Sequence, residues 1–170
     1  NQKLNQYSHL GGATSGTIIP VVKSGAVSND KVFFIGEDDV YELDSENTAT
    51  SVHTIAGGGL VGPSAWANFT NTAGDHYLIV CNQAYDPLSY NVGTDTWTRE
   101  QSGQFTGSTV FNHDAVVHVN VHKERVWYVC SGLQYAFYTD VGAFKGNIND
   151  FPIGHALEHG GSVHSTHTWT

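Results

Sequence analysis

The sequence has little charge, and most of that charge is negative. Only 14% of its 170 residues are charged, and 7 Lys and Arg are outnumbered by 16 Asp and Glu, so the formal net charge is −9 at pH 7. Binding to nucleic acid depends largely on basic side chains that neutralise phosphates. The charge balance therefore argues against a nucleic-acid-binding protein that acts through a basic surface.

Long apolar runs and helical periodicity are missing as well. No run approaches the roughly 20 apolar residues that a bilayer-spanning helix needs. Gly, Thr, Asn and β-branched residues interrupt every window that would otherwise suit a helix, apart from a candidate single turn at 156–159. We therefore predict an all-β chain that makes no membrane contact.

Sequence signatures of catalysis are absent too. The chain has no Gly-x-Ser-x-Gly elbow, phosphate loop or dinucleotide fingerprint. Gly57–Gly59 is followed by neither a helix nor a Lys-Ser/Thr pair, so a flexible loop between strands explains it better than a phosphate cradle does. We predict no enzyme activity and assign no catalytic or cofactor-binding residue.

What the sequence does contain is an internal repeat. Each copy is an apolar strand, a short polar or Gly-bearing turn and a second, aromatic-rich strand, and the copies lie at 31–44, 76–91 and 125–140. The aligned positions Val32, Tyr77 and Val126 are 45 and 49 residues apart. A period in the forties that is built only from strands indicates the blades of a β-propeller.

A further strand precedes each copy. These strands lie at 17–22, 64–69 and 114–121, and a fourth one is expected at 162–169. We therefore predict a partial β-propeller with about three blades and the first strand of a further blade, all within one domain over residues 1–170. The predicted blades are residues 17–61, 62–112 and 113–161, and the next blade begins at residue 162.

The number of blades predicts a fragment of a larger chain. Known propellers close with roughly four to eight blades. The sequence opens on Asn1 rather than Met and ends at Thr170 within a strand pattern. A partial propeller leaves blade faces unpaired, so it should be poorly stable alone. The alternative is a complete small β-sandwich, because turns are as frequent in that fold.

The two cysteines occupy one slot of the repeat. Cys81 and Cys130 each lie four residues after the aligned positions of their copies, and Gly36 fills the slot in the first copy. Equivalent points on neighbouring blades are expected to be farther apart than the roughly 7 Å between Cα atoms that a disulfide tolerates. We predict free, buried thiols, which fit synthesis in a cytosol, with a disulfide as the alternative.

Ten histidines raise the hypothesis of a metal site. Strand alternation places His118, Asn120 and His122 on one face. Asp114 is expected on the same face, and two imidazoles two residues apart can share a metal ion. A half-exposed strand with its valines inward explains the pattern more simply, because no third ligand follows at a diagnostic spacing. We assign no metal-binding residue.

A second histidine group lies near the end of the sequence. His155 and His159 have the i, i+4 spacing of a helical zinc pair, but Glu158 does not directly follow the first histidine as in the metalloprotease motif. The following Gly-Gly step would also end such a helix. Together with His164 and His167, loop histidines on an acidic surface explain the group, and pH sensitivity is a further alternative.

Two carboxylate clusters flank the first hairpin. Glu37–Asp39 falls in its turn, where Asp is favoured for backbone reasons, and Asp44 and Glu46 follow its second strand. A calcium site there would lack the ligand spacing of a known loop. We therefore interpret the clusters as turns.

The segment Ser89–Trp97 resembles the blade-closing turns of kelch proteins and the Asp-box of sialidases through Gly93, Asp95 and Trp97. In those families the Asp hydrogen-bonds the loop backbone and the Trp packs between blades, so the resemblance implies a structural turn. A sialidase also needs a cluster of arginines, whereas this chain has few. The resemblance therefore supports a propeller and speaks against a glycosidase.

A wider resemblance is spread over eight segments of the chain: 64–69, 74–82, 86–90, 118–128, 138–146, 151–154, 160–163 and 168–170. From Gly62 to Thr170 the chain resembles the β-propeller tail proteins of short-tailed bacteriophages, which are called hub, nozzle, tail tubular or packaged-DNA-stabilising proteins. Residues 1–61 match more loosely, chiefly through the 31–44 hairpin. Glu124 replaces an Asn that is usual in relatives, and 155–159 departs from their apolar-and-Lys run.

The resemblance implies a virion structural protein. Such proteins assemble as a ring, commonly of six copies, below the portal and adaptor at the tail axis. The ring is a conduit for the genome and a platform for other tail proteins. The chain would be synthesised in the bacterial host cytoplasm, and phage DNA would pass without specific binding. A like-charged wall does not trap a polyanion, whereas a lumen lined by Lys23, Lys123 and Arg125 would contradict this role.

A carbohydrate-binding or glycan-cleaving propeller is the alternative function. It would present aromatics and carboxylates at one end of a central channel. In a tail protein, exposed aromatics such as Trp66, Trp127 or Tyr135 would instead pack between blades or subunits. Further blades in the complete gene product would favour the tail protein, and a signal peptide with Arg–carboxylate pairs would favour the glycosidase.

Overall fold

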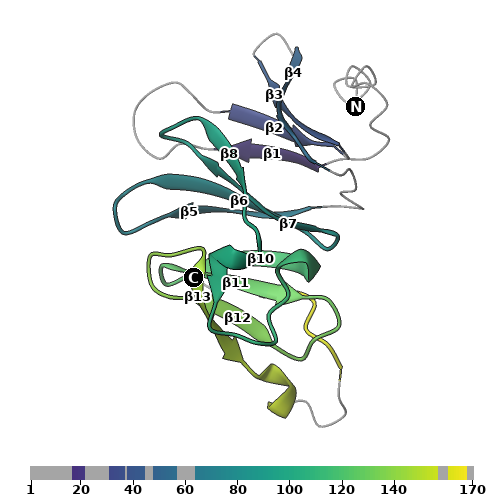
Figure 1. The fold of residues 1–170 in the computed structure, drawn as a ribbon, viewed down its shortest axis with the longest axis vertical. Coiled ribbons are helices and arrows are strands. Elements are labelled where there is room, and N and C mark those ends of the chain that lie inside the picture. The colour runs from purple at the N-terminus through teal and green to yellow at the C-terminus, as the bar shows by residue number, and fades with distance from the viewer. Residues whose placement is uncertain are drawn as a thin grey trace. The chain divides into compact units, whose positions relative to one another are not determined.

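The computed structural model describes residues 17–21, 31–36, 38–44, 48–56, 64–156 and 161–167. The chain divides into two compact units, Asn1–Pro63 and Ser64–Thr170 (Figure 1). The described residues form three sheets joined by loops and short 3-10 helices, so the prediction of an all-β chain is confirmed. Within these ranges, no helix has the length and apolar character needed to cross a membrane.

The first unit is a four-stranded antiparallel meander. Its strands, in sheet order, are β1 (Thr17–Val21), β2 (Lys31–Ile35), β3 (Asp39–Leu43) and β4 (Ala49–Thr54). Phe33 and Ile35 alternate with less buried residues along β2, as expected when one face of a strand meets a core. Val40 and Leu43 of β3 and Ile55 after β4 are buried as well.

The second unit holds two sheets. The first is the antiparallel meander β5 (Ala65–Thr70), β6 (His76–Asn82), β7 (Tyr85–Asn91) and β8 (Thr96–Arg99). The second is the meander β10 (Val116–His122), β11 (Arg125–Cys130), β12 (Ala136–Thr139) and β13 (Gly146–Phe151), and the short strand β9 (Phe105–Thr106) pairs in parallel with β13. The short 3-10 helices η2 (Ser102–Gln104) and η3 (His113–Ala115) lie in connections between strands, and η4 (Ile153–Ala156) follows β13.

One apolar core joins the two sheets of the second unit, and β10 lies against β5 and β6 (Figure 1). Side chains two residues apart point to the same face of a strand. Accordingly, Ile79 and Cys81 of β6 enter this core together with Val126, Tyr128 and Cys130 of β11. The other buried members of the core are Phe69, Val116, Val119, Phe137, Phe144 and Ile148.

The hairpins predicted from the repeat are present. They correspond to β2–β3, β6–β7 and β11–β12, and the strands predicted before them correspond to β1, β5 and β10. The strands β4, β8 and β13 were not predicted, and each of them completes a four-stranded meander. The closure of these sheets into a propeller stays a prediction, as do the blade boundaries.

Two details of the prediction are wrong. The described part of the segment predicted as a strand at 162–169, residues 162–167, forms no strand. It lacks the ladder of backbone hydrogen bonds that defines a strand, and one described backbone bond, from Val163 N to Leu133 O at 2.9 Å, connects it to the loop between β11 and β12. Asp114 lies in η3 rather than in a strand, so strand alternation does not place it beside His118.

Candidate functional site

A buried carboxylate ties the two sheets of the second unit together. Glu100 follows β8 and is 1% exposed. It accepts hydrogen bonds from Ser89 Oγ at 2.6 Å and from Lys145 Nζ at 2.9 and 3.1 Å. Lys145 lies in the loop between β12 and β13, so this ion pair joins the first sheet to the second. Such partners offset the large cost of removing a carboxylate from water.

A second buried carboxylate lies on β7. Asp86 is 6% exposed and accepts a hydrogen bond from Arg99 Nε at 2.6 Å. It also contacts Nδ1 of His113, which belongs to η3 in the connection between the sheets. The Arg99 guanidinium lies 4.3 Å from the centre of the Tyr85 ring, and the His113 ring stacks on Phe105. Asp86 therefore holds the connection against the first sheet.

The contacts of Asp86 and Glu100 hold parts of the fold together. A glycosidase needs two carboxyl groups that flank a site open to substrate. Asp86 and Glu100 are both buried, and each is paired with a cation. They can stabilise the packing of the sheets, but they are not presented to a substrate. Sequence reasoning missed both ties, because Glu100 and Lys145 are 45 residues apart and no local pattern links them.

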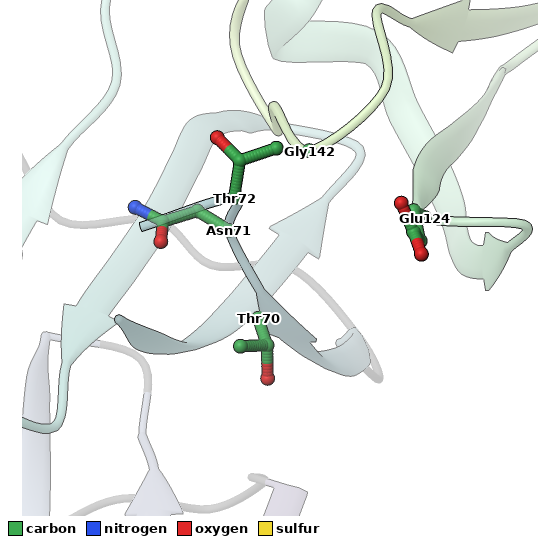
Figure 2. A pocket seen from close by; sticks show the side chains of 5 residues that line it. All are labelled: Thr70, Asn71, Thr72, Glu124 and Gly142. Carbon is green, nitrogen blue, oxygen red and sulfur yellow. The ribbon is translucent and has the colours of Figure 1, made fainter. Parts of the chain in front are cut away.

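A pocket of about 400 Å³ lies among the turns of the second unit (Figure 2). Its lining comes from Thr70, Asn71 and Thr72 at the end of β5, from Glu124 in the turn before β11, and from Gly142 in the loop before β13. In Figure 2 the segment Thr70–Thr72 lies beside the Gly142 loop, and Glu124 lies across the opening. The residues that line the pocket therefore include side chains with hydroxyl, amide and carboxylate groups.

The first histidine group contacts the segment after η4. His118 Nε2 and Asn120 Nδ2 lie 2.9 and 3.1 Å from the carbonyl oxygen of Thr166. The ring centres of His118 and His167 are 5.7 Å apart. His122 lines a groove of about 210 Å³ together with Trp127 and other residues. Val119 and Val121 pack on the core, as predicted for the inward face of this strand.

The structure gathers no metal centre from the histidines within its described ranges, where no group of three or more His, Cys, Asp or Glu can hold a metal ion. His155 falls in η4, whereas Glu158 and His159 lie outside the described residues. His164 and His167 lie 3.3 Å from the hydroxyls of Ser162 and Ser165. The spacing of the proposed helical zinc pair is therefore untested.

The prediction of free, buried thiols is confirmed. Cys81 and Cys130 are unpaired with each other, about 1% exposed or less, and part of the same core. Burial raises the pKa of the Cys81 thiol far above its ordinary value. Burial also raises the pKa of Cys130 to about 11, although a hydrogen bond to the backbone of Asn112 acts in the opposite direction. Both thiols are therefore protonated and poor nucleophiles at neutral pH.

The Ser89–Trp97 segment forms the turn between β7 and β8. Asn91 Oδ1 accepts hydrogen bonds from the backbone N–H groups of Gly93 and Thr94, at 2.8 and 3.1 Å. Asp95 instead accepts a hydrogen bond of 2.5 Å from the Tyr90 hydroxyl, and the Trp97 ring packs on Tyr90. The segment forms a turn as predicted, and Asn91 makes backbone hydrogen bonds of the kind expected of Asp95.

The carboxylates of the first hairpin also have structural partners. Asp39 accepts hydrogen bonds from Ser51 Oγ at 3.1 Å and Thr54 Oγ1 at 2.9 Å, and so connects β3 to β4. Asp44 accepts a hydrogen bond of 2.7 Å from the backbone N–H of Thr48. Glu37, Glu46 and the run 57–59 lie outside the described residues.

The aromatic residues singled out from the sequence have different environments. Trp66 on β5 is 37% exposed. Trp127 packs on Tyr138 of the neighbouring strand, with ring centres 4.9 Å apart. Tyr135 stacks on the buried Phe137. In the sheet that contains β10 to β13, the most exposed large apolar side chain is that of Phe151, at 50%, and the sequence analysis did not select this residue.

No family model, curated protein or solved structure matches the chain. The resemblance to the tail proteins of short-tailed bacteriophages therefore stays a prediction from the sequence.

Proposed function

We propose that this chain is part of a virion structural protein, a tail hub or nozzle component that forms a ring for genome passage and a platform for other tail proteins. The observation that supports this best is that the buried charges hold parts of the fold together. Asp86 and Glu100 both pair with cations that hold elements of the second unit together. Buried charges in these roles serve packing and assembly rather than the conversion of a substrate.

The sheet architecture is compatible with this proposal. Each of the three sheets contains a four-stranded antiparallel meander, and two of them share one core. Blades of a propeller are such meanders and pack against their neighbours. Trp66 and Phe151, at 37% and 50% exposure, are aromatic side chains of the kind that is enriched in protein interfaces.

The location of the protein tests the proposal. Purified particles of the phage that encodes the chain should contain it by mass spectrometry, in a number of copies that fits a ring. Gold-labelled antibodies against residues 64–170 should bind at the tail and leave the capsid unlabelled. Absence of the chain from purified particles, or labelling confined to the capsid, would overturn the proposal.

A further inference from the structure

The two sheets of the second unit pack through opposite faces, as the direction of their backbone hydrogen bonds shows. Along a strand, successive residues alternate both in the face that their side chains take and in the neighbouring strand that their backbone groups bond. In β6, the carbonyl oxygen of His76 accepts a hydrogen bond of 2.9 Å from the backbone N–H of Val92, which follows β7. The odd-numbered residues of β6 therefore bond β5, and two of them, Ile79 and Cys81, enter the shared core.

In β11, the residues that enter the core bond the following strand instead. Val126 of the core donates its backbone N–H to Thr139 Oγ1 of β12 at 3.0 Å. The neighbouring parity points the other way, because Ser131 N donates to Ala115 O, just before β10, at 2.8 Å. We call a face of a meander backward where the residues of its second strand bond the first strand, and forward where they bond the third. The shared core thus joins the backward face of β5–β8 to the forward face of β10–β13.

The shared core leaves the backward face of the sheet β10–β13 unused. Trp127 and its cross-strand partner Tyr138 lie on this face, with ring centres 4.9 Å apart. Phe151 is 50% exposed, and its ring centre lies 5.9 Å from that of Trp127. The Arg125 guanidinium lies 5.4 Å from the centre of the Tyr138 ring. Beside Trp127 and Phe151, residues 161–167 leave a groove of about 210 Å³. We call this surface the Trp127 face.

The sheet of the first unit carries a face of the opposite kind. Gly36 N donates to Asp39 O at 2.9 Å, so the even-numbered residues of β2 bond β3, the third-strand side. Phe34 and its cross-strand partner Tyr41 therefore lie on a forward face, where both are half-buried and their ring centres are 6.3 Å apart. The Tyr41 hydroxyl donates to the Asp39 carboxylate at 3.5 Å, which places this carboxylate at the same face. We call this surface the Phe34 face.

We propose that the Trp127 face of one copy of this chain packs on the Phe34 face of a second copy. The contact repeats the arrangement that the second unit already contains, a backward face on a forward face. Aromatic side chains and arginine are enriched in protein interfaces, and both faces present aromatic rings. Their charges are complementary, because Arg125 lies on one face and Asp39 on the other. Neither of these two residues has an ion pair among the described residues.

The association is head-to-tail, since two different faces meet. Such a heterologous contact closes into a ring when the rotation between copies allows it and otherwise continues as a chain of copies. The proposal does not depend on the tail-hub function. A chain that stays monomeric would overturn the contact between copies and would not bear on the presence of the protein in phage particles.

Sedimentation velocity of the full chain, over micromolar to millimolar concentrations, tests the proposal. We expect reversible association that grows with concentration. Phe151→Glu changes the Trp127 face, and Ser51→Arg changes the Phe34 face, because Ser51 is the exposed cross-strand partner of Tyr41. Each should weaken association roughly tenfold or more, as for the loss of an interface anchor. Val141→Glu, at a position that is 48% exposed and outside both faces, is the matched control and should change nothing.

A mixture of the two interface variants distinguishes head-to-tail pairing from pairing of identical faces. The Phe151→Glu chain keeps an intact Phe34 face and the Ser51→Arg chain an intact Trp127 face, so the mixture should form a dimer that neither variant forms alone. Near-UV circular dichroism shows that each variant is folded. A wild-type chain that is monomeric throughout, an affinity that Ser51→Arg leaves unchanged, an equal effect of Val141→Glu, or a mixture without the dimer would overturn the proposal.

Discussion

Single glycines set how closely the turns of the second unit approach each other. Gly142 and Gly132 both have positive φ, 71° and 74°, but only Gly142 has a neighbour where its Cβ would lie. Gly132→Ala should therefore cost about 1 kcal/mol of unfolding free energy, from the backbone alone. Gly142→Ala should cost about 2–4 kcal/mol, because the clash with Thr72 adds to it. Urea unfolding checks both, and equal losses would contradict the close contact.

The Glu100–Lys145 pair is a second residue-scale test. Lys145→Met leaves Glu100, 1% exposed, with Ser89 as its remaining hydrogen-bond donor among the described contacts. Removing one partner of a buried pair costs about 3–5 kcal/mol, and the lower end applies because the Lys145 side chain is 37% exposed. Urea unfolding followed by tryptophan fluorescence reports on this unit, since all 4 Trp lie within it.

The control for Lys145→Met is Lys123→Met. Lys123 is exposed and has no ion pair among the described residues, so the same change should leave the unfolding free energy nearly unchanged. Equal effects of the two substitutions would show that the Glu100–Lys145 ion pair contributes nothing to the unfolding free energy.

Because both thiols are buried, we expect the stability of the folded chain to fall at alkaline pH. Burial raises the pKa of Cys81 and Cys130 above the ordinary 9.0, so the folded chain keeps both protons to higher pH than the unfolded chain does. Stability is then complete below about pH 9 and falls as the pH rises toward 11. The expected loss between pH 9 and 10 is roughly 1 kcal/mol per thiol.

Urea unfolding at pH 8, 9 and 10 measures this loss. The double variant Cys81→Ala, Cys130→Ala should show a clearly smaller fall in unfolding free energy over the same range. A wild-type chain as stable at pH 10 as at pH 8 would contradict the burial of the thiols.

At the scale of elements, the sequence predicted the strands that carry strong patterns. The hairpins of 31–44, 76–91 and 125–140 combine apolar, β-branched and aromatic residues with short turns. β4, β8 and β13 were missed because they are short or polar: β13 begins with Gly146 and contains Asn147, Asn149 and Asp150. The parallel pairing of β9 with β13 depends on tertiary packing, which no local pattern encodes.

Among the site features, the local ones were predicted and the long-range ones were not. The Ser89–Trp97 turn and the inward valines of β10 follow from spacing along the chain. The Glu100–Lys145 ion pair and the pocket in Figure 2 join residues that belong to different sheets, and Asp86 joins β7 to β8 and to η3 in the connection between the sheets. Such contacts leave no periodic signal in one sequence.

The segment 161–167 provides a prediction at the scale of elements. A carbonyl only accepts hydrogen bonds, so both His118 Nε2 and Asn120 Nδ2 donate to Thr166 O. The double variant His118→Ala, Asn120→Ala removes both donors, each worth about 0.5–1.5 kcal/mol. Hydrogen exchange of the Val163 amide, which bonds Leu133 O, should then become roughly tenfold faster or more.

The matched control for this variant is His122→Ala. His122 lies on the same strand and lines the neighbouring groove, but no described hydrogen bond connects it to residues 161–167. Its removal should leave the exchange of Val163 unchanged. Equal acceleration by both variants, or exchange that is already unprotected in the wild type, would contradict the attachment of this segment.

At the scale of the whole molecule, charge and sheet architecture are compatible with the proposed role as a tail hub or nozzle component. A net charge of −9 does not favour retention of a passing polyanion. Meanders that share a core are suited to extension by further sheets, as in propellers. Interfaces rather than catalytic groups would then perform the work of the protein.

Cryo-electron microscopy of the complete gene product, alone and in its native particle, tests this role most directly. The tail-hub proposal predicts a closed ring of several copies on the axis of a short tail, with β-propeller density around the conduit. A monodisperse monomer that is absent from every particle would contradict it.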